Sequence, residues 1–189
     1  MNKASIRIGF DFDKVFADYP PLIPSKVINY LYKKHNHKLS YRIPGRFEQK
    51  IRVLSHHTFF RPPIKRNIEA LKKITKEKDL EIFLISSRFQ FLKERTEKWL
   101  NKNNFKKYFK ELYFNFENQQ PHLFKDDIIN KLKIKKYIDD DLHLLMYLAQ
   151  KHPEIDFYWI ENNFDKDKFD LPSTIIPIKD LEEFCNKYI

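Results

Sequence analysis

Glycine is almost absent from this sequence. Gly9 and Gly45 are the only two glycines among 189 residues. Phosphate-cradling loops of the G-x-G-x-x-G or G-x-x-x-x-G-K type need several closely spaced glycines, so neither type can be present. If the protein binds a phosphate group, other groups have to do so.

Cysteine and long apolar runs are also scarce. Cys185 is the only cysteine, which excludes an internal disulfide and a cysteine-based zinc site, and we expect it to be structural. No apolar run reaches the length of a membrane-spanning helix, and the apolar stretch in the N-terminal MNKASIRIGFDF is too short for a signal peptide. We therefore expect a soluble, cytoplasmic protein.

Positive charge is in excess, with a formal net charge of +10. A basic protein attracts anions, such as phosphorylated metabolites, nucleic acid or acidic surfaces. Its lysines are dispersed along the chain, in the pairs Lys33-Lys34, Lys72-Lys73, Lys106-Lys107 and Lys135-Lys136. Such dispersal is more typical of a solvated surface than of a binding stripe, so nucleic acid is a possible partner but not the favoured one.

The remaining sequence alternates between two patterns. Its length fits one domain, or one domain with a small insertion. Apolar β-rich runs occupy residues 6–12, 81–87, 111–116, 136–141, 156–161 and 174–178. Helix-like spacing of apolar residues occurs between them, at 64–78, 91–100 and 142–149. Strands that alternate with helices predict an α/β fold with a Rossmann-like, mostly parallel sheet flanked by helices.

One long interval breaks this alternation. Residues 19–62 contain PPLIP at 20–24, an aromatic helix-like stretch at 27–35 and a basic segment at 41–52, and FRPP closes the interval. The prolines cluster near both ends, as they do in hinges and linkers. We predict a small, mainly helical cap at 19–62, inserted into a core made of residues 1–18 and 63–189.

Polar residues follow three of the predicted strands. Asp11 and Asp13 end the first, Ser86-Ser87-Arg88 the second, and Asp139-Asp140-Asp141 the fourth. Ligands of open parallel sheets bind beyond the carboxyl ends of the strands, so we expect these residues to gather there. Side chains alternate along a strand, which lets Asp11 and Asp13 point the same way. Converging carboxylates need a cation, and oxygen-only ligands suit Mg²⁺.

Four short patterns occur in a recognisable order. They are the D-x-D of Asp11-Phe12-Asp13-Lys14-Val15, the strand-ending Ser86, a lysine near a helix start at Lys125, and the acidic pair Asp139-Asp140. Together they resemble the motifs of the haloacid dehalogenase (HAD) superfamily of phosphotransferases, and its nucleotidase-like phosphatases in particular. The resemblance implies a HAD-like core with a small helical cap of the C1 type after the first motif.

The resemblance also implies a chemistry for the D-x-D pair. Asp11 would be the nucleophile that forms an aspartyl-phosphate intermediate, and Asp13 the general acid and base. Dehalogenases of the superfamily lack the second aspartate, because no leaving alcohol needs a proton there. The presence of Asp13 therefore favours phosphoryl transfer over hydrolysis of a carbon–halogen bond.

Metal and phosphate ligands follow from the same resemblance. The implied magnesium ligands are Asp11, the backbone carbonyl of Asp13, Asp139 and, directly or through water, Asp140. The implied phosphate-binding residues are Ser86, Ser87 and Lys125, which would orient the phosphoryl group and offset its charge.

Several positions keep two interpretations. Lys14 stands where the family usually has glycine, and its side chain could contact substrate or point to solvent. Ser87 could instead cap the following helix. Neighbouring lysines at 131, 133, 135 and 136 are alternatives to Lys125 as the phosphate-binding lysine. The interval to the acidic pair and a helix pattern starting at Asp126 favour Lys125. Further candidates for substrate contact are Asp18, Arg42, Arg46 and Arg88. Asp141 is expected to be a helix N-cap.

These residues predict a Mg²⁺-dependent phosphomonoester hydrolase. We expect its substrate to be a small phosphorylated metabolite, such as a nucleoside monophosphate. The net positive charge keeps a nucleic-acid end phosphatase as an alternative, and a non-catalytic binding protein with the same fold is another. The complete acidic constellation argues against the non-catalytic alternative.

Overall fold

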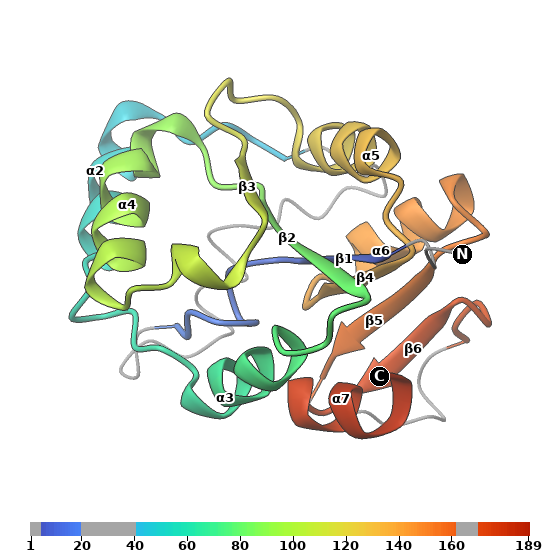
Figure 1. Cartoon of the computed structure of the whole chain (residues 1–189). Coiled ribbons are helices and arrows are strands. Elements are labelled where there is room, and N and C mark those ends of the chain that lie inside the picture. The colour runs from blue at the N-terminus through green and yellow to red at the C-terminus, as the bar shows by residue number, and fades with distance from the viewer. Residues whose placement is uncertain (1–4, 20–40, 162–169) are drawn as a thin grey trace.

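A computed structural model of the protein describes residues 5–19, 41–161 and 170–189. Within these residues, six parallel strands form the centre of the protein (Figure 1). The strands lie in the order β3-β2-β1-β4-β5-β6. Their bounds are β1 Ile6–Phe10, β2 Leu80–Ser86, β3 Glu111–Phe114, β4 Lys136–Asp139, β5 Asp156–Ile160 and β6 Ile175–Ile178. All five neighbouring pairs are parallel, so the carboxyl ends of the strands share one edge of the sheet.

The strands are apolar because both faces of the sheet are covered. Ile8 and Phe10 of β1 pack into one buried core, together with Leu84 of β2. Phe83 and Ile85 of β2 pack into a second core on the other face. This alternation within near-continuous apolar runs is typical of parallel strands buried on both sides.

Among the described residues, helices cover both faces of the sheet (Figure 1). α3 (Lys65–Ile74), α4 (Lys93–Lys102) and α7 (Leu181–Tyr188) contribute to the core that contains Phe10. α5 (Pro121–Leu132) and α6 (Leu142–Lys151) contribute to the opposite core. The predicted α/β, Rossmann-like fold is therefore confirmed. Among the described residues, no helix is long and apolar enough to cross a membrane.

Several element boundaries differ from the sequence-based prediction. β1 ends at Phe10 instead of residue 12, and β4 ends at Asp139 instead of residue 141. The helix expected from Asp126 begins earlier, at Pro121, because the fixed φ of proline suits the first position of a helix. Lys125 consequently lies within α5. The predicted helix at 91–100 is divided into a 3₁₀ turn, η1 (Gln90–Leu92), and α4. A second 3₁₀ turn, η2 (Lys106–Tyr108), precedes β3.

Only part of the predicted cap can be placed. Residues 20–40, which include PPLIP and the aromatic stretch at 27–35, lie outside the described residues. The basic segment after them leads into α2 (Arg46–Ser55), which contacts η1. The division into a core and a cap stays a prediction.

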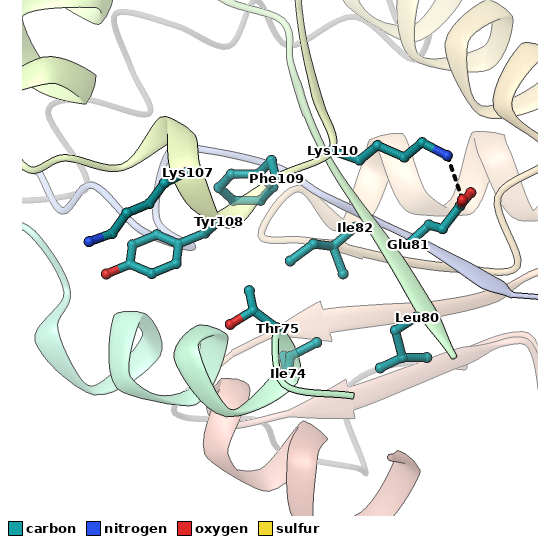
Figure 2. A pocket seen from close by; sticks show the side chains of 9 residues that line it. All are labelled: Ile74, Thr75, Leu80, Glu81, Ile82, Lys107, Tyr108, Phe109 and Lys110. Carbon is teal, nitrogen blue, oxygen red and sulfur yellow. Dashed lines mark hydrogen bonds and ion pairs between the residues drawn. The ribbon is translucent and has the colours of Figure 1, made fainter. Parts of the chain in front are cut away.

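A pocket of about 280 Å³ opens where β2 begins, shown in Figure 2. Its lining comes from the end of α3, the start of β2 and the segment around η2. The lining residues are Ile74, Thr75, Leu80, Glu81, Ile82, Lys107, Tyr108, Phe109 and Lys110. Because it lies at the amino end of β2, this pocket is separated from the polar residues that follow the carboxyl ends of the strands.

The substitution Gly9→Ala tests how tightly β1 packs against its neighbours. A Cβ atom at Gly9 would lie 2.8 Å from Cδ2 of Tyr137 and 3.0 Å from Cδ1 of Ile85. Tyr137 is fully buried, so its ring has no free space to move into. We expect the free energy of unfolding, measured by urea denaturation, to fall by about 1–3 kcal/mol.

Gly45→Ala is the matched control, because its added methyl group meets no atom within 4 Å. It should change the free energy of unfolding by less than about 1 kcal/mol. Equal losses for the two variants would contradict the packing argument.

Candidate active site

Three carboxylates meet where β1 and β4 end. These strands are neighbours, and the backbone N–H of Asp11 donates to the carbonyl of Ile138 at 2.8 Å, which places Asp11 beside the end of β4. One carboxylate oxygen from each of Asp11, Asp139 and Asp140 lies within 4.8 Å of the other two. Asp11 and Asp139 are buried, and Asp140 is half-buried. We call these three residues the acidic cluster.

Lys125 joins two members of the acidic cluster. Its Nζ lies 2.7 Å from Oδ1 of Asp11 and 2.6 Å from Oδ2 of Asp139. Burial alone would lower the pKa of Lys125, but the charges of the two aspartates raise it well above its ordinary value. The lysine therefore stays charged inside the protein.

Lys125 is also the lysine that the structure places at the cluster. Lys131, Lys133 and Lys135 are exposed to solvent. Lys136 pairs with Asp156, at 3.2 Å, and donates to the Tyr158 hydroxyl. The spacing argument in the sequence thus selects the lysine that contacts the acidic cluster.

One ammonium does not balance three carboxylates. Burial raises the pKa of Asp11 to about 7, against the lowering effect of Lys125, and Asp139 adds to the rise. Burial and the charges of Asp139 and Asp11 raise the pKa of Asp140 well above its ordinary value. A set of close, negatively charged oxygen ligands suits a hard divalent cation such as Mg²⁺.

Asp13 belongs to a different set of contacts. It accepts two hydrogen bonds from Arg88, from Nε at 2.8 Å and from Nη2 at 2.7 Å, and it forms an ion pair with Arg61. Burial would raise the pKa of Asp13, but the two guanidinium groups hold it well below its usual range. We call the group formed by Asp13, Arg61 and Arg88 the arginine clamp.

Asp11 and Asp13, which strand alternation would let point the same way, have different partners in the structure. β1 ends at Phe10, so the strand alternation that would align the two side chains has already stopped. Phe12 between them is fully buried against the ring of Trp99, with the ring centroids 4.9 Å apart. Asp11 is left to face Lys125, whereas Asp13 faces the arginines.

Both arginines are fixed by their surroundings. Arg88 donates from Nη1 to the Thr96 hydroxyl at 3.1 Å, and its guanidinium lies over the ring of Phe12, 4.3 Å from the centroid. The carbonyl oxygen of Arg61 accepts a hydrogen bond from Nε1 of Trp99 at 2.7 Å. The clamp is thus built on the buried aromatic core.

His56 completes the surroundings of Arg61. Burial and the neighbouring arginines lower the pKa of His56 well below its ordinary value, so the ring is neutral. Nδ1 of His56 lies 2.8 Å from the carbonyl oxygen of Arg52, so Nδ1 carries the ring proton and donates it to that oxygen. Nε2 lies 3.3 Å from Nη2 of Arg61 and accepts a hydrogen bond from it. Sequence reasoning assigned neither His56 nor Arg61 to the site, since nothing in the local sequence links them to Asp13.

Lys14 has a left-handed backbone conformation, with φ of 60°. Its backbone N–H donates to the carbonyl of Ala17 at 2.9 Å and closes the turn after β1. Glycine adopts this conformation without steric cost, which is the physical reason that glycine suits the position. The side chain pairs with Asp18 at 2.7 Å and lies over the ring of Tyr19. Contact of Lys14 or Asp18 with substrate stays a prediction.

The two serines lie at the end of β2. Ser86 is the last residue of the strand and is buried, and its carbonyl accepts from the backbone N–H of Asn115 at 3.2 Å. Ser87 is half-buried. Their carboxyl-end position is the one that the sequence predicted, and their role in phosphate binding stays a prediction.

Asp141 and Tyr41 form the rim beside the acidic cluster. Asp141 caps α6, as predicted, because its side chain accepts from the backbone N–H groups of His143 and Leu144. The Tyr41 hydroxyl donates to Oδ2 of Asp141 at 3.1 Å, and the Tyr41 backbone exchanges hydrogen bonds with Gln120. Tyr41 therefore ties the segment before α2 to the carboxyl edge of the sheet.

Two further candidates are placed farther out. Arg42 is exposed and pairs with Glu48 of α2. Arg46 is the first residue of α2 and is exposed as well. Within the described ranges, neither has a described contact with the acidic cluster or the arginine clamp, so their contact with substrate also stays a prediction.

Comparison with known proteins identifies the fold. No family model matches the sequence, and no curated protein is similar to it in sequence. A haloacid dehalogenase-like family hydrolase from Xanthomonas campestris superimposes with a TM-score of 0.61 and 12% identity, over 98% of this chain and 95% of that one. A HAD family enzyme from Bacteroides thetaiotaomicron, in complex with magnesium and inorganic phosphate, gives 0.54 and 15%, over 86% and 97%.

A third similar structure comes from an RNA repair complex. A chain of the Pnkp1/Rnl/Hen1 complex superimposes with a TM-score of 0.53 and 11% identity, over 85% of this chain and 43% of that one. Identities this low bear on the fold alone. The chain has the fold of the HAD-like hydrolases.

The raised pKa of Asp11 predicts a pH dependence of stability in the metal-free protein. The folded state holds this proton up to about pH 7, whereas an unfolded aspartate loses it near pH 4. The folded state therefore binds more protons in that window, and this contribution to stability is lost as the pH rises. Asp11→Asn removes the group, so the stability of the variant relative to wild type should increase from about pH 5 to about pH 7.5.

Urea denaturation in a chelating buffer measures this difference. Mg²⁺ added to the wild type should stabilise it more at the higher pH, because the ligands have to be deprotonated. A difference between variant and wild type that does not change with pH would disprove the assignment.

The backbone at Lys14 predicts a second stability effect. Lys14→Val places a β-branched residue in the left-handed region and should lower the free energy of unfolding by more than about 1 kcal/mol. Lys14→Asn also removes the ion pair with Asp18 but tolerates this conformation, so it should cost clearly less. Urea denaturation compares the two variants, and equal losses would show that the ion pair alone matters.

Proposed function

We propose that this protein is a Mg²⁺-dependent phosphomonoester hydrolase that forms an aspartyl-phosphate intermediate. The acidic cluster, with Lys125 bridging two of its carboxylates, is the observation that carries the proposal. The HAD-like fold supports it, as does the magnesium and inorganic phosphate in the Bacteroides thetaiotaomicron enzyme of the same fold.

The metal would be held by Asp11, Asp139 and Asp140, with the backbone carbonyl of Asp13. The carboxylates fit this role because their oxygens lie within 4.8 Å of one another and their negative charge exceeds that of one ammonium. Bound Mg²⁺ supplies positive charge that offsets the phosphoryl oxygens.

Asp11 would act as the nucleophile. One of its carboxylate oxygens bonds to the phosphorus atom while the bond from phosphorus to the leaving oxygen breaks, and water later hydrolyses the aspartyl-phosphate. The ammonium of Lys125 opposes protonation of Asp11 and so favours the reactive carboxylate. Lys125, Ser86 and Ser87 would bind the phosphoryl oxygens and orient the group for attack.

Asp13 would protonate the leaving oxygen and then activate the water. In the structure its carboxylate is occupied by Arg88 and Arg61, and these ion pairs favour its ionised form. Proton transfer by Asp13 therefore requires that its hydrogen bonds in the arginine clamp be broken or exchanged.

The substrate we propose is a small phosphorylated metabolite such as a nucleoside monophosphate. A nucleic-acid end phosphatase is the second candidate. The net charge of +10 favours it, together with the fold shared with a chain of an RNA repair complex. Turnover of a 5′-phosphorylated oligonucleotide that falls steeply with salt would support the second candidate, because backbone contacts release counterions.

Hydrolysis of p-nitrophenyl phosphate with Mg²⁺ or with a chelator tests the proposed function. We expect turnover that requires the metal, and a loss of kcat of at least about a thousandfold in Asp11→Asn. Asp156→Asn is the matched control. Asp156 is the first residue of β5 and so lies at the amino end of the strands, away from the carboxyl ends, and its side chain is 52% exposed.

Two outcomes would reject the catalytic assignment. One is a wild-type protein with no metal-dependent turnover. The other is an Asp11→Asn variant that remains as active as Asp156→Asn.

A further inference from the structure

The arginine clamp holds more positive than negative charge. Within the described ranges, Asp13 is the one carboxylate that pairs with Arg61 or Arg88. His56, which also contacts Arg61, is a neutral ring with its proton on Nδ1. Two guanidinium groups against one carboxylate leave one unit of positive charge, and uncompensated charge is costly away from water.

Hydrogen bonding in the clamp is incomplete as well. Nε of Arg61 is buried and, among the described residues, has no hydrogen-bond partner. A buried donor without an acceptor costs free energy, and such groups are rare in folded proteins. Both the charge and the donor point to an anion that the clamp can accept in addition to, or in place of, the Asp13 carboxylate.

The clamp is open on the side of Asp13. The side chains of Arg61 and Arg88 are 4% and 3% exposed, whereas that of Asp13 is 25% exposed. Asp13 is therefore the most solvent-exposed member of the clamp. Thr96 and Phe12 contact the guanidinium group of Arg88. His56 and the ring of Tyr19 contact that of Arg61, so an incoming oxyanion would meet donors that are already oriented.

The clamp also adjoins the site of the proposed reaction. Asp13 follows Asp11 by two residues, and its charge contributes to the electrostatic environment of Asp11. Lys125 and the acidic cluster lie on the side of the transferred phosphoryl group, and Asp13 is the residue assigned to the leaving oxygen. An anion on the clamp would thus belong to the leaving portion of the same substrate.

We propose that Arg61 and Arg88 bind a second anionic group of the substrate, a carboxylate or a phosphate on its leaving portion, which takes over the hydrogen bonds now accepted by Asp13. This inference rests on the proposed hydrolase function and adds a substrate class to it. The exchange releases the Asp13 side chain from the clamp at the moment when the substrate is in place.

Matched substrate pairs test the preference. In 3-phosphoglycerate a carboxylate replaces a neutral hydroxymethyl group of glycerol 3-phosphate, and adenosine 3′,5′-bisphosphate adds a phosphate to adenosine 5′-monophosphate. In one of the two pairs, we expect kcat/KM to be at least about tenfold higher for the substrate that carries the second anion. The pair that shows this difference identifies the anion as a carboxylate or a phosphate. Equal values in both pairs would reject the inference and leave the hydrolase function standing.

Conservative variants connect the preference to the clamp. Arg61→Lys and Arg88→Lys keep the charge but lose the planar fork of donors. We expect each to reduce the ratio of kcat/KM values within the favoured pair by about tenfold, mainly through a higher KM of the anionic member. A ratio that both variants leave unchanged would show that the second anion binds elsewhere.

A binding measurement tests whether the arginine clamp binds an anion, and it does not depend on catalytic turnover. Asp13→Asn removes the carboxylate that occupies the clamp, so sulfate should raise the midpoint of thermal unfolding of this variant by at least about 3 °C more than that of wild type. Sodium chloride at equal ionic strength corrects for screening, and Asp156→Asn is the matched control. Equal sulfate-induced shifts of the unfolding midpoint in all three proteins would reject the anion site. If Asp13→Asn shows the larger shift but every phosphatase assay fails, the hydrolase function alone is rejected.

Discussion

Charge that is buried without full compensation is the constraint on which this site depends. At the carboxyl edge of the sheet, three carboxylates share one ammonium in the acidic cluster, and two guanidinium groups share one carboxylate in the arginine clamp. The first set lacks positive charge and the second lacks negative charge. Because burial weakens solvation, each imbalance is a binding preference, for a divalent cation in one set and for an oxyanion in the other.

The aromatic core keeps the two sets apart. Phe12 separates Asp11 from Asp13 in the sequence, and its buried ring packs on Trp99 and lies under the guanidinium of Arg88. Trp99 in turn donates to the backbone of Arg61. The same rings that stabilise the fold therefore position the clamp, while Asp11 faces the opposite layer and meets Lys125 of α5. Packing and function are coupled at this one turn of the chain.

Much of the acidic cluster could be predicted from the sequence, because it depends on a general property of parallel sheets. The carboxyl ends of β1 and β4 share one edge of the sheet, so the sequence predicts that Asp11 and Asp139 meet. Lys125 was selected by its distance from the acidic pair. The sequence also placed Arg88 at this edge, but it could not predict the ion pairs of the clamp. Arg61 and Arg88 lie 48 and 75 residues from Asp13, and no local pattern marks an arginine as the partner of a distant carboxylate.

The sequence by itself determined the α/β fold, the edge of the sheet at which the polar residues gather, and the lysine that joins them, since strand periodicity and residue order are local properties. Tertiary structure alone decided that the two aspartates of the first motif have different partners. It also showed why the position of Lys14 suits glycine, since the backbone there has a φ of 60°. These facts depend on which side chains pack together after the chain has folded, because ion pairing and burial are set by neighbours in space.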